Sequence, residues 1–342
     1  MPSASPTRPC VVTRPFPGSN VGSNLASLAG AVWLARQLGR ELVVDWRGQS
    51  QLRDPLLNYF TEFFEAPPEL LGVPVHYAPV EGIDYGELTP TEPGYAHLMG
   101  TGQSPAPEQH LVLTTYHGPD RLHPGPQPER FRLLRSFYRC IRPAAEIEER
   151  VESWWAENLD GSFVVGVNVR TGNGAYFGKG KQFEGRVDVS LFADHERFLR
   201  VLAGACRART VRLPEQLRGG ARVFYATDSK AMSELLAGLP GARTRRTVFP
   251  PPDTGDTFVF DGDDYTDRDS IVDTLADMFL LARCDALVFN TSMFNQYARV
   301  LNGEFGGNEV HIEGLFARRR ARLALGRLRR RARTLVPSHA RT

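Results

Sequence analysis

A single arginine stands where an apolar run gives way to a glycine-rich turn. The stretch 163–174 reads FVVGVNVRTGNG, so Arg170 follows a predicted buried strand and precedes Gly172 and Gly174. Glycines let the backbone approach a bound group, and a guanidinium can hold a phosphate through two parallel hydrogen bonds. A lone arginine is usually a surface ion-pair partner, but this placement favours binding of an anionic ligand.

Two more predicted strands, 222–226 and 286–289, end in small polar residues and lead into predicted helices. The residues after them are Thr227, Asp228 and Ser229, and then Asn290, Thr291 and Ser292. Such residues are ordinary helix caps, but helix N-termini also favour anions. Because the pattern occurs at three strand ends, it predicts a site for a phosphate-bearing ligand.

Three loops allow other chemistry. The loop 18–24 (GSNVGSN), with Asp45 after the next strand, is a poor match to a nicotinamide-dinucleotide fingerprint because its glycines are spaced GxxxG; otherwise Ser23 or Asn24 caps a helix. Asp261 and Asp263 form a DxD pattern that could bind a metal or could be a solvated loop. The charged loop 179–188 could be solvated or act as a lid.

Composition limits the classes of protein to consider. The chain has 342 residues, of which 42% are apolar and 23% charged, and this length and composition fit two globular domains. The net charge of +2 argues against nucleic acid as the main partner. Four scattered cysteines and no signal or membrane-spanning pattern lead us to expect a cytoplasmic protein. The arginine-rich tail 316–342 is either a solvated helix or a weak contact for an anionic surface.

Predicted elements place these residues in an α/β protein. A strand at 11–13, a helix from about 25 to 38 and a strand at 42–46 form a βαβ unit, and 66–130 is rich in Pro and Gly. Helical patterns then lead to a predicted domain boundary near residue 160. The strands that follow alternate with helices, which predicts a doubly wound parallel sheet with ligands at its carboxyl edge.

Four segments together resemble the NodZ family of bacterial α-1,6-fucosyltransferases, which is related to the eukaryotic core α-1,6- and protein O-fucosyltransferases. They are 18–65, VVGVNVRTGNG (164–174), VFYATDS (223–229) and 269–301. The resemblance implies a GT-B-like α/β fold of two Rossmann-like domains facing a central cleft. We therefore divide the chain into an acceptor-side domain 1–158, a nucleotide-sugar domain 159–315 and the tail 316–342.

The resemblance also implies an inverting, metal-independent glycosyltransferase without a cofactor. Such an enzyme transfers a sugar from a nucleotide-diphosphate donor to a hydroxyl group of a glycan or small molecule, and GDP-fucose is the leading candidate donor. Arg170 would stabilise the leaving pyrophosphate, and Glu184 and Asp188 are the local candidates for a base. The implied donor-binding residues are Asn168, Arg170, Gly172, Asn173, Thr227, Asp228, Ser229, Thr291 and Ser292. The implied cleft residues on the acceptor side are Gly18, Asn20, Gly22, Asp45, Trp46 and Arg47.

This chain departs from the family pattern beside Arg170. Asn168 and Thr171 stand where the family commonly has histidine, and Ala175 replaces an expected acidic residue. These departures leave open which nucleotide base the donor carries, which acceptor is used and which residue acts as the general base. A nicotinamide-dependent oxidoreductase and a non-catalytic sugar-nucleotide-binding protein are the alternatives.

Overall fold

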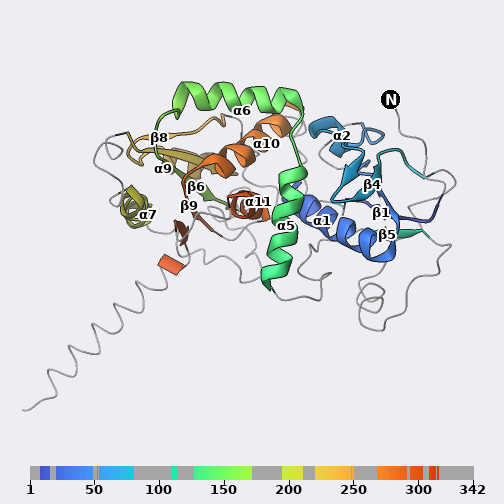
Figure 1. Cartoon of the computed structure of the whole chain (residues 1–342). Coiled ribbons are helices and arrows are strands. Elements are labelled where there is room, and N and C mark those ends of the chain that lie inside the picture. The colour runs from blue at the N-terminus through green and yellow to red at the C-terminus, as the bar shows by residue number, and fades with distance from the viewer. Residues whose placement is uncertain are drawn as a thin grey trace, which may run out of the picture.

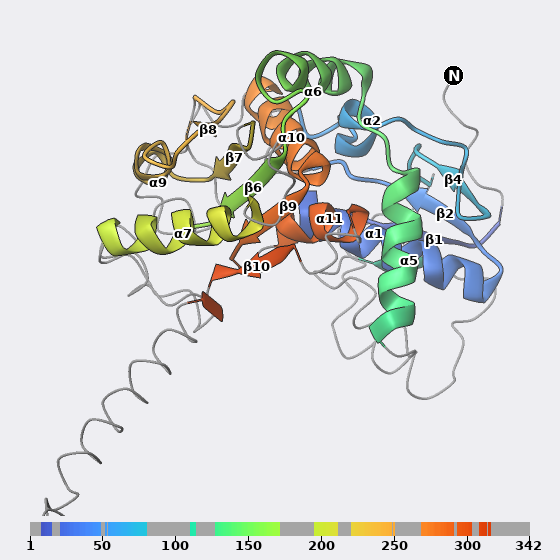
Figure 2. The ribbon, with the colours of Figure 1, turned by 60° about the vertical axis from the view of Figure 1, so that its left-hand side comes forward.

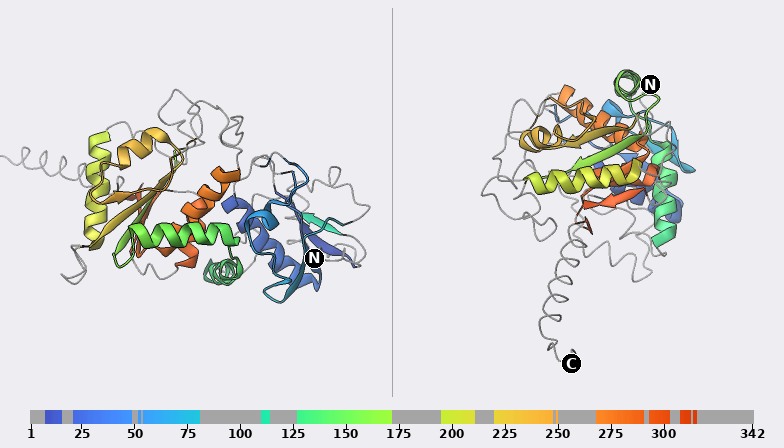
Figure 3. Two further views of the ribbon diagram at one scale, coloured as in Figure 1. Left: turned by 90° about the horizontal axis from the view of Figure 1, so that it is seen from above. Right: turned by 90° about the vertical axis from the view of Figure 1, so that its left-hand side faces the viewer.

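The chain contains two five-stranded sheets that lie side by side (Figures 1 and 3). The computed structural model describes residues 8–15, 21–48, 52, 54–80, 110–113, 127–171, 195–210, 220–247, 249, 268–290, 293–302, 308–312 and 314–315. These two sheets, in which most strand pairs are parallel, confirm the predicted α/β class.

The first sheet has the strand order β3-β4-β2-β1-β5. Strands β1 (Cys10–Thr13), β2 (Glu41–Val44), β4 (Val73–His76) and β5 (Leu111–Leu113) are parallel, and β3 (Glu69–Leu70) is antiparallel to β4. The short helix α2 (Tyr59–Phe63) lies between β2 and β3 in the chain. The predicted βαβ unit is thus present, and the Pro- and Gly-rich region contributes three short strands.

The second sheet has the order β10-β9-β6-β7-β8, and all its pairs are parallel. Its strands are β6 (Val164–Val169), β7 (Arg222–Thr227), β8 (Ala242–Arg243), β9 (Ala286–Phe289) and β10 (Glu309–His311). Val165, Val167 and Val169 face a core under α7 (His195–Thr210) and α9 (Lys230–Leu236). Alternation then turns Gly166 and Asn168 toward the opposite face.

Helix α1 (Val21–Leu38) begins four residues earlier than predicted. Ser23 and Asn24 therefore lie inside its first turn, and the prediction that one of them caps the helix is wrong. The apolar Val21 is 4% exposed and packs in the core, so burial extends the helix past the expected start.

Helices α10 (Arg268–Arg283) and α11 (Met293–Leu301) join the two sheets (Figure 2). Helix α11 contacts both α1 and α5 (Gln127–Cys140): the ring of Tyr297 lies 5.0 Å from that of Tyr138 on α5 and 5.2 Å from that of Phe279 on α10. One apolar core accordingly contains residues of both sheets. The two halves share a core at this point.

Helix α6 (Ala145–Asn158) precedes the predicted boundary but packs against α10. Its Trp154 ring meets Phe224 of β7 edge-on at 5.3 Å. A boundary at 158/159 stays a prediction, and the contacts place α6 with the second sheet. Among the helices of the described ranges, none is long and apolar enough to cross a bilayer.

Gly166 lies where β6 meets α10, and this contact yields a test of the packing. A Cβ at this position would lie 2.9 Å from Cys284 Sγ and 3.2 Å from Leu281 Cδ2. We expect Gly166→Ala to lower the free energy of unfolding by about 1–3 kcal/mol through overpacking. The control is Gly204→Ala in α7, where a Cβ meets nothing within 4 Å and alanine should stabilise the helix by up to about 1 kcal/mol. Denaturant titration of both variants measures this, and equal stabilities would contradict the packing.

Candidate functional site

The backbone of Arg170 is fixed by the side chain of Asn290. The Arg170 N–H donates to Asn290 Oδ1 at 2.8 Å, and Asn290 Nδ2 donates to the Arg170 carbonyl at 2.7 Å. Each residue directly follows a strand, β6 and β9 respectively, and Asn290 is 1% exposed. The reciprocal pair joins two strand ends and leaves the Arg170 side chain, 29% exposed, at the surface of the site.

Asp228 joins the same turn to the end of β7. Its Oδ1 accepts hydrogen bonds from the N–H and the hydroxyl of Thr171, at 2.7 and 2.9 Å, and its Oδ2 lies 3.6 Å from Arg170 Nε. Charge-assisted N–H···O bonds are about 2.7–2.9 Å long, so the ion pair is loose. Asp228 holds the turn through Thr171 and faces Arg170 without forming a tight fork with it.

The other described donor-site residues are buried within the strand ends. Ser229 accepts from the Met232 N–H and caps α9, and its own N–H points to Thr227 Oγ1, both at 3.4 Å. Asn168 is 4% exposed, and its Nδ2 donates to the Ala226 carbonyl at 3.1 Å. Its Oδ1 has no hydrogen-bond partner among the described residues. Ser229 thus has its ordinary capping role, and Asn168 offers an acceptor.

Two charged residues near the end of β7, Arg246 and Asp277, were not predicted as site residues from the sequence. Arg246 is 8% exposed; its Nη1 donates to the Thr227 carbonyl at 3.3 Å and its Nη2 to Thr274 Oγ1 at 2.8 Å. Asp277, one turn along α10 from Thr274, is 1% exposed, and neither of its carboxylate oxygens accepts a hydrogen bond within the described ranges. Burial raises the pKa of Asp277 to about 6, against the attraction of Arg246 and Arg245. An aspartate inside the apolar run TLADMFLLA was the available signal.

Several residues that the sequence predicts for the site lie outside the described ranges. They are Gly18, Asn20, Gly172, Asn173, Glu184, Asp188, Asp261, Asp263, Thr291 and Ser292. Among the residues that the structure does describe, no group of three or more His, Cys, Asp or Glu side chains could hold a metal ion.

At the carboxyl end of the first sheet, Arg47 donates to both carboxylate oxygens of Asp45, at 2.7 and 2.9 Å. Asp45 is fully buried and the Arg47 side chain is 28% exposed. Trp46 is 1% exposed and meets Phe60 edge-on at 5.4 Å, so its side chain packs in the core. Gly22 is buried in the first turn of α1.

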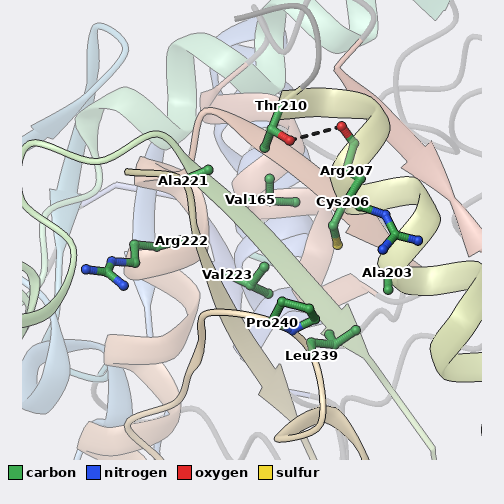
Figure 4. Close-up of a pocket in the computed structure, with 10 residues that line it drawn as sticks. All are labelled: Val165, Ala203, Cys206, Arg207, Thr210, Ala221, Arg222, Val223, Leu239 and Pro240. Atoms are coloured by element: carbon green, nitrogen blue, oxygen red, sulfur yellow. Dashed lines mark hydrogen bonds between the residues drawn. The ribbon is translucent and has the colours of Figure 1, made fainter. Parts of the chain in front are cut away.

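A cavity of about 150 Å³ lies at the opposite end of the second sheet (Figure 4). It is lined by Val165, Val223 and Cys206 among others, near the amino ends of β6 and β7. In a parallel pair Arg170 and Thr227 lie at the other ends of these strands. The cavity is therefore separate from the candidate site.

The Asn290 contact can be tested through stability. Asn290→Ala leaves the buried N–H and carbonyl of Arg170 without their partner, so we expect the free energy of unfolding to fall by about 1–3 kcal/mol. Asn158→Ala, which removes a local bond to the Trp154 carbonyl at the end of α6, is the matched control and should cost less. Denaturant unfolding compares them; an Asn290→Ala protein as stable as the control variant would show that the pair does not hold the strand ends.

The chain is similar in sequence to proteins of one known family. The family model for Nodulation protein Z (NodZ) matches residues 9–84 and 131–311. Nodulation protein Z of Bradyrhizobium diazoefficiens is 28% identical over 305 residues, covering 82% of this chain and 76% of the relative. The protein of the same name from Sinorhizobium fredii is 25% identical over 297 residues, covering 82% and 87%.

Solved structures show the same fold. A NodZ α-1,6-fucosyltransferase soaked with GDP-fucose matches with a TM-score of 0.60 at 22% identity, over 86% of this chain and 93% of that one. POFUT1 in complex with GDP matches with a TM-score of 0.56 at 14% identity, over 90% and 99%. The family model spans most of the chain, including β6, β7 and β9, whose carboxyl ends form the site, and this protein therefore belongs to the NodZ family.

Proposed function

We propose that this protein transfers fucose from GDP-fucose to a hydroxyl group of a glycan or small-molecule acceptor. The observation that carries the proposal is Arg170, whose backbone is fixed between two strand ends while its guanidinium stays at the surface of the site. The proposal draws further support from membership of a family in which one enzyme was solved after soaking with GDP-fucose.

The reaction is a single displacement with inversion. The acceptor oxygen forms a bond to the anomeric carbon as the bond from that carbon to the phosphate oxygen breaks, the acceptor proton passes to a base, and GDP leaves. Negative charge grows on the diphosphate during this step, so a fixed cation beside it lowers the barrier more than it stabilises the ground state. Arg170 supplies that cation, and the reaction then needs no metal ion.

The remaining predicted residues keep proposed roles at the donor site, at the acceptor side and as the base. Asn168, Thr227 and Asp228 would shape the donor site together with Gly172, Asn173, Thr291 and Ser292. Ser229 would act indirectly, by capping α9. Arg47, held by Asp45, would face the acceptor with Gly18 and Asn20, and Glu184 and Asp188 stay the proposed candidates for the base.

Asp277 supports a guanine base in the donor. A buried carboxylate without hydrogen-bond donors is costly, so a bound group that supplies donors is favoured there. The Watson–Crick edge of guanine carries two adjacent N–H donors, which match the two oxygens of one carboxylate. Arg246 places Asp277 beside the donor site, because its guanidinium reaches the Thr227 carbonyl and attracts Asp277. We therefore propose that Asp277 accepts from the guanine base.

Two rival functions gain no support. The nicotinamide alternative needed a phosphate-binding turn around Gly22, which instead lies buried inside α1. A non-catalytic binding protein would bind GDP without transfer or donor hydrolysis, so an activity assay separates it from the proposed enzyme. We also propose a cytoplasmic location, which draws support from the four cysteines, all of which are free.

The leaving-group role of Arg170 predicts a large kinetic effect. We expect Arg170→Ala to lower kcat/KM for GDP-fucose at least about 10²-fold, the scale of a lost transition-state charge contact. Thermal unfolding should change little, because Asn290 bonds only the backbone of Arg170. Transfer or donor hydrolysis is measured with excess chelator present. Near-normal turnover by the variant would remove Arg170 from the mechanism, and loss of wild-type activity rescued by Mn²⁺ would overturn the metal-free reaction.

The Asp277 proposal predicts base selectivity and its pH dependence. We expect wild-type protein to bind GDP more tightly than inosine diphosphate, which lacks the exocyclic amine, and to lose GDP affinity as the pH falls through about 6 and the carboxylate becomes protonated. Asp277→Asn should weaken GDP about 10²-fold and remove the preference over inosine diphosphate. Calorimetry of both nucleotides tests this, with the exposed Asp269→Asn on the same helix as the control. A retained preference in Asp277→Asn would exclude the contact.

A further inference from the structure

Arg245 differs from its neighbour Arg246 in what it contacts. Arg246 makes two hydrogen bonds that tie the end of β7 to α10. Arg245 has an 11% exposed side chain that forms an ion pair with Asp273 and places its Nε 3.9 Å from Asp277 Oδ1. Its Nη2 is the atom that meets Asp273, and its Nε donates no hydrogen bond to the described residues. Among the described residues, Arg245 is thus a largely buried cation that faces two carboxylates of α10.

Asp273 is shared with a second arginine from another helix. Arg150 of α6 donates from Nη1 to Asp273 Oδ1 at 3.1 Å and from Nη2 to Asp269 Oδ1 at 2.8 Å. The side chains become less exposed along this row, from 34% at Arg150 and 22% at Asp273 to 11% at Arg245 and 2% at Asp277. Alternating charges therefore run from the surface of α6 inward to the carboxylate of Asp277.

We propose that Arg245 is a positioning residue for donor recognition, which holds the Asp277 carboxylate ionised and in place for the nucleotide base, while Asp273 and Arg150 hold Arg245. This inference rests on the proposed role of Asp277. Arg245 acts through Asp277 and needs no contact with the donor.

The surrounding charges explain why one arginine can control Asp277. Within the described part of the chain, the charged groups that face it are Arg246 and Arg245, on the segment after β8, and Asp273, on its own helix. Asp273 favours the protonated form of Asp277, and the two arginines favour the ionised form. Arg246 exerts the larger of the two attractions and is itself held by Thr227 and Thr274. Without Arg245, burial and Asp273 would be opposed by Arg246 alone.

The experiment measures GDP affinity by calorimetry between pH 5 and pH 9. An opposite charge within about 4–6 Å shifts a carboxyl pKa by about 1–3 units, so Arg245→Met should move the midpoint of the affinity loss upward by that amount. At pH 7 a shift of about two units leaves GDP bound about tenfold more weakly. Arg245→Lys keeps a cation and should return the midpoint toward that of the wild type. Arg243→Met, at an exposed position two residues earlier in β8, where the guanidinium donates to the Ala242 carbonyl, is the matched control and should leave it unchanged.

The outcomes separate this inference from the proposal on which it rests. A wild-type affinity without a midpoint near pH 6 would overturn the role of Asp277. A wild-type midpoint that Arg245→Met leaves in place, with affinity lost equally at every pH, would overturn the role of Arg245 and show a merely structural residue. An upward shift reversed by lysine supports it.

Discussion

The site depends on the hydrogen bonds that lock the carboxyl ends of β6, β7 and β9 to one another. A parallel sheet delivers these ends to one edge, but each chain then turns away with polar backbone groups that need partners. Asn290 supplies a partner for both the N–H and the carbonyl of Arg170, and Asp228 accepts from the N–H and the side-chain hydroxyl of Thr171. The guanidinium therefore projects from a turn that is bonded on both sides.

The second constraint is the cost of burying charge beside this edge. Asp277 is an interior ionisable group whose oxygens accept no hydrogen bond from the part of the chain that the structure describes, which is expensive unless the group has counter-ions or a ligand. Arg245 and Arg246 provide the counter-ions, and the proposed base provides the donors. The proposed diphosphate site and the proposed base site thus both adjoin the end of β7, the first through Asp228 beside Arg170 and the second through Arg246 at the Thr227 carbonyl.

Much of this could be predicted from the sequence, because apolar runs that end in polar turns are local signals. The strand 286–289 has the predicted bounds, and β7 differs from the predicted strand 222–226 by one residue. The start of α1 was missed because tertiary burial of Val21 decided it. The partners of Arg170 and Thr171 are separated from them by 120 and 57 residues, and no local pattern reports such pairs.

The departures from the family pattern acquire a physical meaning in the structure. Thr171 is fully buried and uses both its N–H and its hydroxyl on Asp228, so it serves the turn. Asn168 keeps one acceptor without a protein partner in the described ranges, which makes it the departure that a ligand or an ordered water would meet. The central claim is that Arg170 holds the donor diphosphate, and a crystal structure of the GDP complex tests it most directly. We predict the Arg170 guanidinium within hydrogen-bond distance of the diphosphate; a diphosphate bound without contact to Arg170 would contradict the account.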